Sequence, residues 1–163
     1  MTPQQLERWI ERLQQINQQE ALPRRGSNKQ RTTIAICAES QQMLKHLYKG
    51  EIEWRAVNRV LIGCLQFILE DRRLQPDLFV ISRLQQINQR VLLSREDGDE
   101  TRVIPVHKEA KALLTLLKSE FNSQEGRCRW HWQTFNHALM RCLNDNDRLI
   151  AACSAVITGG LAA

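Results

Sequence analysis

The sequence lacks the motifs by which common enzyme classes are recognised. Its 163 residues contain no glycine-rich phosphate loop, no nucleophile elbow, no His-Glu-x-x-His motif and no paired-carboxylate arrangement. Glycine and proline are scarce, at seven and four residues, and 42% of the chain is hydrophobic, which is typical of a folded chain rather than a disordered one. We therefore expect a globular protein that is not an enzyme and that holds no cofactor.

Signals for export, disulfide bonding and membrane insertion are also missing. Residues 1–19 are polar and helical in pattern, which does not fit a secretory signal. The five cysteines are odd in number and none has Cys-x-x-Cys spacing, so we expect reduced thiols. Residues 150–163 form an apolar tail that is too short to span a bilayer. These absences predict a cytoplasmic protein without a membrane partner.

The charge of the chain is modestly positive and gathers in small clusters. The formal net charge is +5 and the isoelectric point is near 9.2, values that are compatible with a nucleic-acid partner without requiring one. Basic residues gather at Arg24, Arg25, Lys29 and Arg31, at residues 72–73, and at Arg127 and Arg129. We expect a polyanion to be bound by such clusters rather than by the overall charge.

An internal repeat is the strongest pattern in the chain. The segment Arg-Leu-Gln-Gln-Ile-Asn-Gln occupies residues 12–18 and recurs unchanged at residues 83–89. In the same order, residues 34–47 match residues 104–117 in their apolar positions, and residues 54–65 match residues 132–143 in Trp, Asn, Leu and Cys positions. Three matches in one order indicate two copies of one unit, residues 1–71 and 72–149, which we expect to fold as one domain.

Each copy has the pattern of a helix, a strand and two further helices. Apolar residues at three- and four-residue spacing predict an amphipathic helix at the start of each copy, with Leu6, Trp9, Ile10, Leu13 and Ile16 in the first and Val80, Ile81, Leu84 and Ile87 in the second. Strands are predicted at residues 32–37 and 103–107, and later helices at residues 39–48, 54–70, 109–118 and 132–143. The fold class is therefore mostly α, with two tandem helix-strand-helix-helix repeats. We expect the strands to pair into one short antiparallel ribbon, because each alone would leave half of its backbone groups unsatisfied.

The strand and the two helices after it resemble the ribbon-helix-helix superfamily of the Arc, MetJ and CopG type. The resemblance covers residues 31–70 and 101–149, and it consists of element order and apolar positions rather than a chemical motif. In that family two units pair their strands and interlock their helices, and this chain supplies both units. It looks like the single-chain double form found among TraY-type accessory proteins of conjugative plasmids, with an extra helix before each strand.

This resemblance implies that the outward face of the ribbon enters the major groove of DNA. If Ile34 and Ile36 face the core, the outward residues that can hydrogen-bond a base are Arg31, Thr33, Thr101 and His107. Arg102, beside Thr101, and the basic residues Arg24, Arg25 and Lys29 before the first strand are further candidates for DNA contact.

The resemblance also implies a phosphate contact at the start of the last helix, where free backbone amides and the helix dipole favour an anion. Arg127 and Arg129 suit such a contact in the second copy. Glu51 and Glu53 occupy the equivalent place in the first copy and would repel a phosphate. We therefore expect the two copies to contact DNA unequally.

Together these patterns predict a sequence-specific double-stranded DNA-binding protein of a bacterium, plasmid or phage, acting as a transcriptional regulator or a DNA-processing accessory factor. The alternative is a helical adaptor or anti-regulator that binds another protein through its Trp- and Leu-bearing faces. Because one chain holds both copies, we expect a monomer that mimics a dimer, or a homodimer, and an asymmetric DNA site.

Several cysteine, histidine and tryptophan residues could instead serve only the core. Cys128, His131, His137 and Cys142 are zinc-ligand types, but the first copy has no matching histidines, so we expect no metal site. Trp54 and Trp132 stand at matched positions and are predicted to anchor the core. Cys64 and Cys142 are matched in the same way, and both are predicted to be buried and slow to react.

Overall fold

The computed structural model describes residues 1–19, 21–22, 31–75, 78–89, 101–124 and 128–144. Within these ranges the elements are α1 (Pro3–Asn17), β1 (Arg31–Cys37), α2 (Ala38–Leu47), α3 (Glu53–Leu69), α4 (Phe79–Asn88), β2 (Thr101–His107), α5 (Lys108–Gln124) and α6 (His131–Leu143). The fold is mostly helical, with one two-stranded antiparallel sheet, as the sequence predicted.

The apolar tail at residues 150–163 lies outside the described residues. Among the helices that are described, none combines the length and the apolar character needed to cross a membrane.

β1 and β2 pair in the predicted antiparallel sense, although they are far apart in the sequence. The register places Ile34 opposite Ile104 at the centre of the ribbon. Both isoleucines, together with Ile36 and Val106, are buried against the helices. Branched side chains favour the extended backbone here, and burial of one face of the ribbon fixes the register, because a slip of one residue would expose these side chains.

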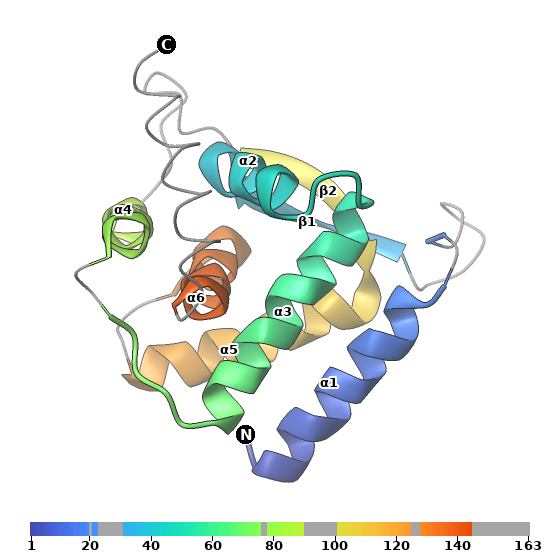
Figure 1. Ribbon diagram of the computed structural model, residues 1–163, viewed down its shortest axis with the longest axis horizontal. Coiled ribbons are helices and arrows are strands. Elements are labelled where there is room, and N and C mark those ends of the chain that lie inside the picture. Colours follow the sequence, from blue (N-terminus) through green and yellow to red (C-terminus); the bar gives the residue numbers. More distant parts are fainter. Residues whose placement is uncertain (20, 23–30, 76–77, 90–100, 125–127, 145–163) are drawn as a thin grey trace.

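The helices pack into a core with α3 and α6 at its centre (Figure 1). α1 lies against α3, α4 lies against α6, and α5 packs against α6 and crosses behind α3 in this view. The predicted anchors Trp54 and Trp132, at the starts of the two central helices, are 4% and 5% exposed. Burial of both tryptophans confirms this part of the sequence analysis.

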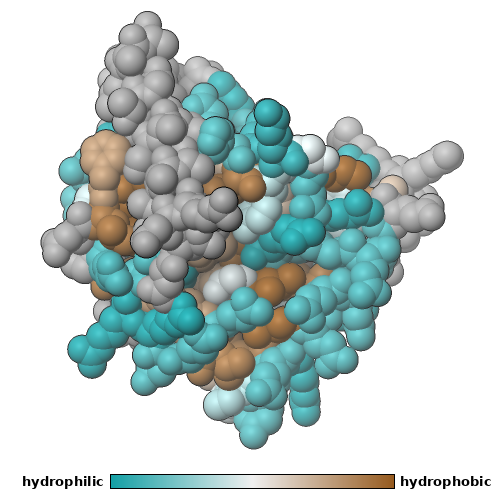
Figure 2. Space-filling model, viewed as in Figure 1, coloured by the Kyte–Doolittle hydropathy of each residue, from teal (hydrophilic) through white to brown (hydrophobic). Residues whose placement is uncertain are grey.

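α1 shows how the local sequence sets where a helix begins and which of its sides is buried. The Thr2 hydroxyl accepts the backbone N–H of Gln5 at 3.2 Å, and the Gln5 side chain accepts the N–H of Thr2 at 2.8 Å, while Pro3 stands in the first turn, where its missing N–H is not needed. Leu13 and Ile16 turn inward and are fully buried. The surface over α1 in Figure 2 is mostly hydrophilic, whereas hydrophobic residues emerge over α3.

The prediction that His107 lies on the outward face of the ribbon is wrong. β2 continues into α5 without a loop, and His107 is the last residue of the strand. Its Nδ1 accepts the backbone N–H of Glu109 at 3.2 Å, so the ring serves the first turn of α5 and is only 1% exposed. Cys37, at the end of β1, is the N-cap residue of α2 and is also buried. The outward face therefore ends before the last residue of each strand.

The prediction for Cys64 and Cys142 is half right. Cys64 is fully buried, as expected, but Cys142 is half-buried. Cys142 meets α3 at Gly63, and a Cβ atom built on that glycine would lie 2.9 Å from the Cys142 sulfur. Because Gly63 carries no side chain, α3 can approach the Cys142 sulfur closely at this point.

Candidate nucleic-acid interface

The outward face of the ribbon is formed by alternate residues of the two strands. The register places Thr33 opposite Pro105 and Ala35 opposite Val103 on this face, and Thr101 lies at its end, opposite the buried Cys37. Arg31, Thr33 and Thr101, three of the residues predicted to reach DNA bases, are exposed here. Val103 lies among them and is 69% exposed.

Arg102 is also exposed, but it does not share this face. It lies opposite Ile36 in the register, and Ile36 points into the core. Arg102 is the second residue of β2, and its neighbours Thr101 and Val103 hold the positions on the outward face.

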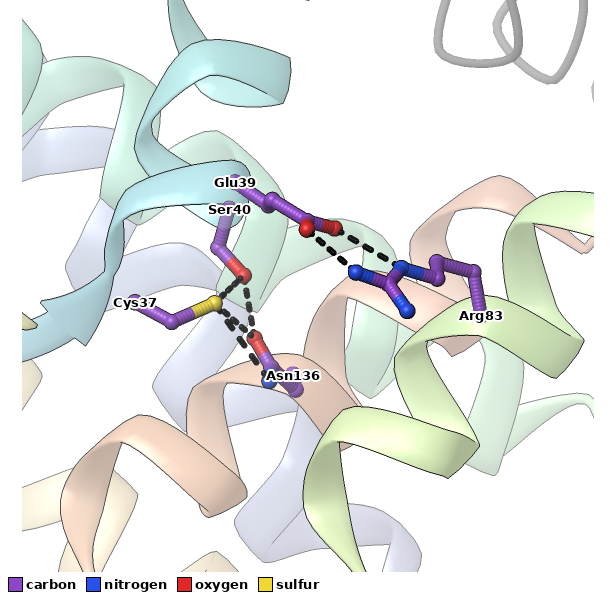
Figure 3. A network of polar contacts seen from close by, with 5 residues as sticks. All are labelled: Cys37, Glu39, Ser40, Arg83 and Asn136. Atoms are coloured by element: carbon purple, nitrogen blue, oxygen red, sulfur yellow. Dashed lines mark hydrogen bonds and ion pairs between the residues drawn. The ribbon is translucent and has the colours of Figure 1, made fainter. Parts of the chain in front are cut away.

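The ribbon carries positive charge and no negative charge, since neither strand contains an acidic residue and Arg31 and Arg102 are both cationic. The first carboxylates after the strands are Glu39 and Glu109, and each is paired with an arginine. Arg83 donates to Glu39 from Nη2 at 2.7 Å and from Nε at 3.2 Å (Figure 3), and Arg12 donates to Glu109 from Nε at 2.6 Å. Each ion pair offsets the acidic charge of the carboxylate that follows its strand.

A second basic region surrounds the start of α6. Arg129 is exposed two residues before this helix, and Lys118 of α5 donates from Nζ to the Arg129 carbonyl oxygen at 2.8 Å. His131 contacts the Thr115 hydroxyl at 3.3 Å, and its pKa is lowered by burial and by the nearby charges of Lys111 and Lys118. The helix dipole adds positive potential at this end.

The start of α3 is different in charge, as the sequence predicted. Glu53 lies in the first turn and accepts a hydrogen bond from Gln41 Nε2 at 2.9 Å. Glu51 forms an ion pair of 2.6 Å with Arg59. The start of α6 is therefore the better of the two for a phosphate.

A buried polar network lies at one end of the ribbon, and sequence reasoning missed it (Figure 3). Ser40 at the start of α2 contacts Cys37 Sγ at 2.8 Å and donates to Asn136 Oδ1 in α6. Burial raises the pKa of the Cys37 thiol, with smaller opposing effects from hydrogen bonds with Ser40 and Asn136. A raised pKa keeps the thiol protonated, so Cys37 serves as a hydrogen-bonding partner rather than as a nucleophile.

The four zinc-type residues do not converge. Cys128 contacts the Thr134 hydroxyl at 3.2 Å, and the His137 ring lies 5.3 Å from the ring of Phe121. Cys142 lies 3.7 Å from the Tyr48 hydroxyl, in a groove of about 450 Å³ that also borders Gly63. Across the described residues, no three His, Cys, Asp or Glu side chains are grouped so that they could hold a metal ion.

The structure thus brings Arg31, Thr33 and Thr101 together on one exposed face and places Arg129 apart, at the start of α6. Arg24, Arg25, Lys29 and Arg127 lie outside the described residues. No protein-family model, curated protein or solved structure matches this chain.

Proposed function

We propose that the protein binds double-stranded DNA in a sequence-dependent way, with the paired strands inserted in the major groove. The observation that carries the proposal is the exposed face of the ribbon, where Arg31, Thr33 and Thr101 can offer hydrogen bonds to bases and where the two strands carry no acidic side chain. The major groove of B-DNA is wide enough to admit a two-stranded ribbon, and each base pair presents a distinct pattern of donors, acceptors and methyl groups there.

We further propose that the chain is a tandem relative of the ribbon-helix-helix arrangement. Reciprocal ion pairs support this proposal: Arg12 of α1 reaches Glu109 at the start of α5, and Arg83 of α4 reaches Glu39 at the start of α2. Both arginines open the repeated heptapeptide, and both glutamates stand two residues after a strand. Each half therefore holds the other by the same contact, as two subunits of a dimer would.

Phosphate contacts would come from residues beside the ribbon. Arg129, with Lys118 close to it, can hold one phosphate at the positive end of α6. Arg102 can reach another from the edge of β2. Contacts of this kind fix the position of the protein on the duplex, while the outward face selects the sequence.

A second candidate function is binding of another protein. The observation that favours it is the exposure of large apolar side chains on the helices, with Phe79 at 53% and Leu116 at 46%. Separate exposed apolar residues are common on protein surfaces, however, and these two lie on different helices, α4 and α5. The ribbon, whose two strands carry two arginines and no carboxylate, therefore gives the stronger argument.

Salt dependence of DNA binding tests the proposal. Filter binding with the duplex that flanks the protein's own gene should show an affinity that falls steeply as salt rises, because each phosphate contact releases counterions. Arg31→Ala should weaken binding, and Arg8→Ala on the exposed side of α1 is the matched control that should not. An affinity that is insensitive to salt, or two variants with equal effects, would point to the protein-binding alternative.

A further inference from the structure

Val103 is an unusual residue for an exposed ribbon. At 69% it is more exposed than the other large hydrophobic residues found exposed among the described residues, Ile52, Phe79 and Leu116. It lies directly opposite Ala35 in the register, so the two apolar side chains are neighbours across the strands. On β2 the next residue of this face is Thr101. The outward face therefore carries an apolar pair, Ala35 and Val103, between Thr33 on one side and Thr101 on the other.

The register makes Val103 the counterpart of Thr33. The ribbon is centred on the pair Ile34 and Ile104, and Thr33 and Val103 each precede one of these isoleucines. Valine and threonine have nearly the same shape, but a methyl group replaces the hydroxyl. The two ends of the ribbon thus present a hydrogen-bonding group and an apolar group at equivalent places.

We infer that Val103, with Ala35 beside it, reads the 5-methyl group of thymine in the major groove. The inference rests on the proposed DNA binding and adds the chemistry that the ribbon recognises. The thymine methyl is the apolar group on the base edges of the major groove, and small apolar side chains contact it. Over a G·C pair, Val103 would cover polar groups without replacing their hydrogen bonds, which disfavours that pair.

The opposite end of the ribbon has different chemistry. Arg31 and Thr33 lie there on the same face of β1, and both can donate hydrogen bonds to base edges. The charge of the ribbon also fits a duplex better than a second protein surface, because its strands carry arginines and no carboxylate. Val103 therefore marks the half of the site in which thymine is selected.

A thymine-to-deoxyuridine exchange tests this inference. Bound sequences are first selected with the full-length protein from randomised duplexes at low salt. Each thymine in the selected site is then replaced singly by deoxyuridine, which removes only the 5-methyl group. At one thymine the exchange should weaken wild-type binding roughly fourfold, the ratio expected for one buried methyl group.

Two variants show which side chain is responsible. Val103→Ala should bind the thymine and deoxyuridine duplexes with nearly equal affinity, because the apolar contact is gone. Thr33→Val is the matched control, and it should keep the full effect at that same thymine. Val103 is exposed, so neither the fold nor the helical circular dichroism signal should change in V103A.

The outcomes separate the inference from the function on which it rests. Selection of a sequence that wild-type protein binds equally well with thymine or deoxyuridine would overturn the methyl contact and leave DNA binding intact. A deoxyuridine effect that persists in V103A would assign the methyl contact to another residue and would also overturn the inference. Failure to retain any duplex at low salt would overturn both.

Discussion

Asn136 in α6 donates a hydrogen bond from Nδ2 to Oδ1 of Asn88 in α4, at 2.9 Å. The same contact occurs between α3 and α1, where Asn58 donates to Asn17, also at 2.9 Å. Asn88 and Asn17 are equivalent residues of the repeated heptapeptide, and each donates to the carbonyl three residues before its partner, at 3.0 Å and 3.2 Å. Two identical segments therefore make one pattern of contacts twice, which supports the proposed tandem arrangement.

The two central asparagines should differ in their effect on stability. Asn136 also accepts a hydrogen bond from Ser40, whereas Oδ1 of Asn58 is buried with no partner among the described residues. Asn136→Ala leaves more buried groups unsatisfied, and each such group costs about 1–3 kcal/mol. We expect Asn136→Ala to lower the free energy of unfolding more than Asn58→Ala does, measured by urea denaturation. A larger loss of stability for N58A than for N136A would contradict the buried hydrogen bonds that join Cys37, Ser40 and Asn136.

Gly63 and Cys142 give a second prediction about the core. Gly63→Ala brings a Cβ atom to 2.9 Å from the Cys142 sulfur, which is closer than packed side chains approach. The clash should outweigh the gain of roughly 1 kcal/mol that alanine brings over glycine inside a helix, so G63A should lower the midpoint of unfolding.

The double variant G63A/C142A removes the sulfur atom that the added methyl group would meet. Cys142→Ser would not serve the same purpose, because its hydroxyl would occupy the place of the sulfur. With the sulfur gone, the nearest remaining atom is Cβ of residue 142, at 3.4 Å. We expect G63A to be less harmful in the C142A background than in the wild type. Equal effects in both backgrounds would show that the sulfur is not the obstacle.

Much of the fold was accessible from the sequence, because the relevant signals are local. The change from helical to alternating spacing around Ile34 and Ile104 located the strands, and the repeat predicted that they pair. The length of α5 was underestimated, since the expected helix at residues 109–118 extends to Gln124. Phe121, four residues after Leu117 and fully buried, continues the helical spacing and could have revealed this extension.

The parts of the site that sequence reasoning missed depend on contacts between distant residues. Cys37 and Asn136 are 99 residues apart in the chain, and no spacing rule connects them. The burial of His107 depends on the point where the backbone leaves the extended conformation, and alternation alone does not give that point. The close packing of Cys142 against α3 depends on the glycine that faces it from that helix.

Two histidines should make stability depend on pH. Burial lowers the pKa of His107 and of His131 below the ordinary value of 6.5. The unfolded chain then binds protons more readily than the folded one, so stability is complete above pH 6.5 and is lost as the pH falls below it. Each histidine can contribute a slope of up to about 1.4 kcal/mol per pH unit in that range.

Urea denaturation between pH 7.5 and pH 5 measures this dependence. His131→Gln should reduce the slope, because it removes one group that binds a proton mainly in the unfolded state. His46→Gln is the control, since His46 is exposed on α2. A slope that is unchanged in H131Q, or steeper than that of the wild type, would contradict the lowered pKa of His131.

Arg31 and Arg129 should affect DNA binding in different ways. Arg31 lies on the outward face of β1, so Arg31→Ala should cost about 1–3 kcal/mol of discrimination and relax the preference at one end of the site. Arg129 lies beside the positive end of α6, where it would contact a phosphate. Arg129→Ala should therefore weaken specific and nonspecific binding about equally and reduce the slope of log affinity against log salt by about one.

These two effects are measured by filter binding of the selected duplex and of a scrambled duplex over a series of salt concentrations. The ratio of the two affinities should fall in R31A and stay constant in R129A, because only the first residue would contact a base. Arg8→Ala, remote from both positions on α1, should change neither the ratio nor the slope. A variant R31A that lowers both affinities equally would mean that Arg31 contacts only phosphate, and the insertion of the ribbon in the major groove would then be wrong.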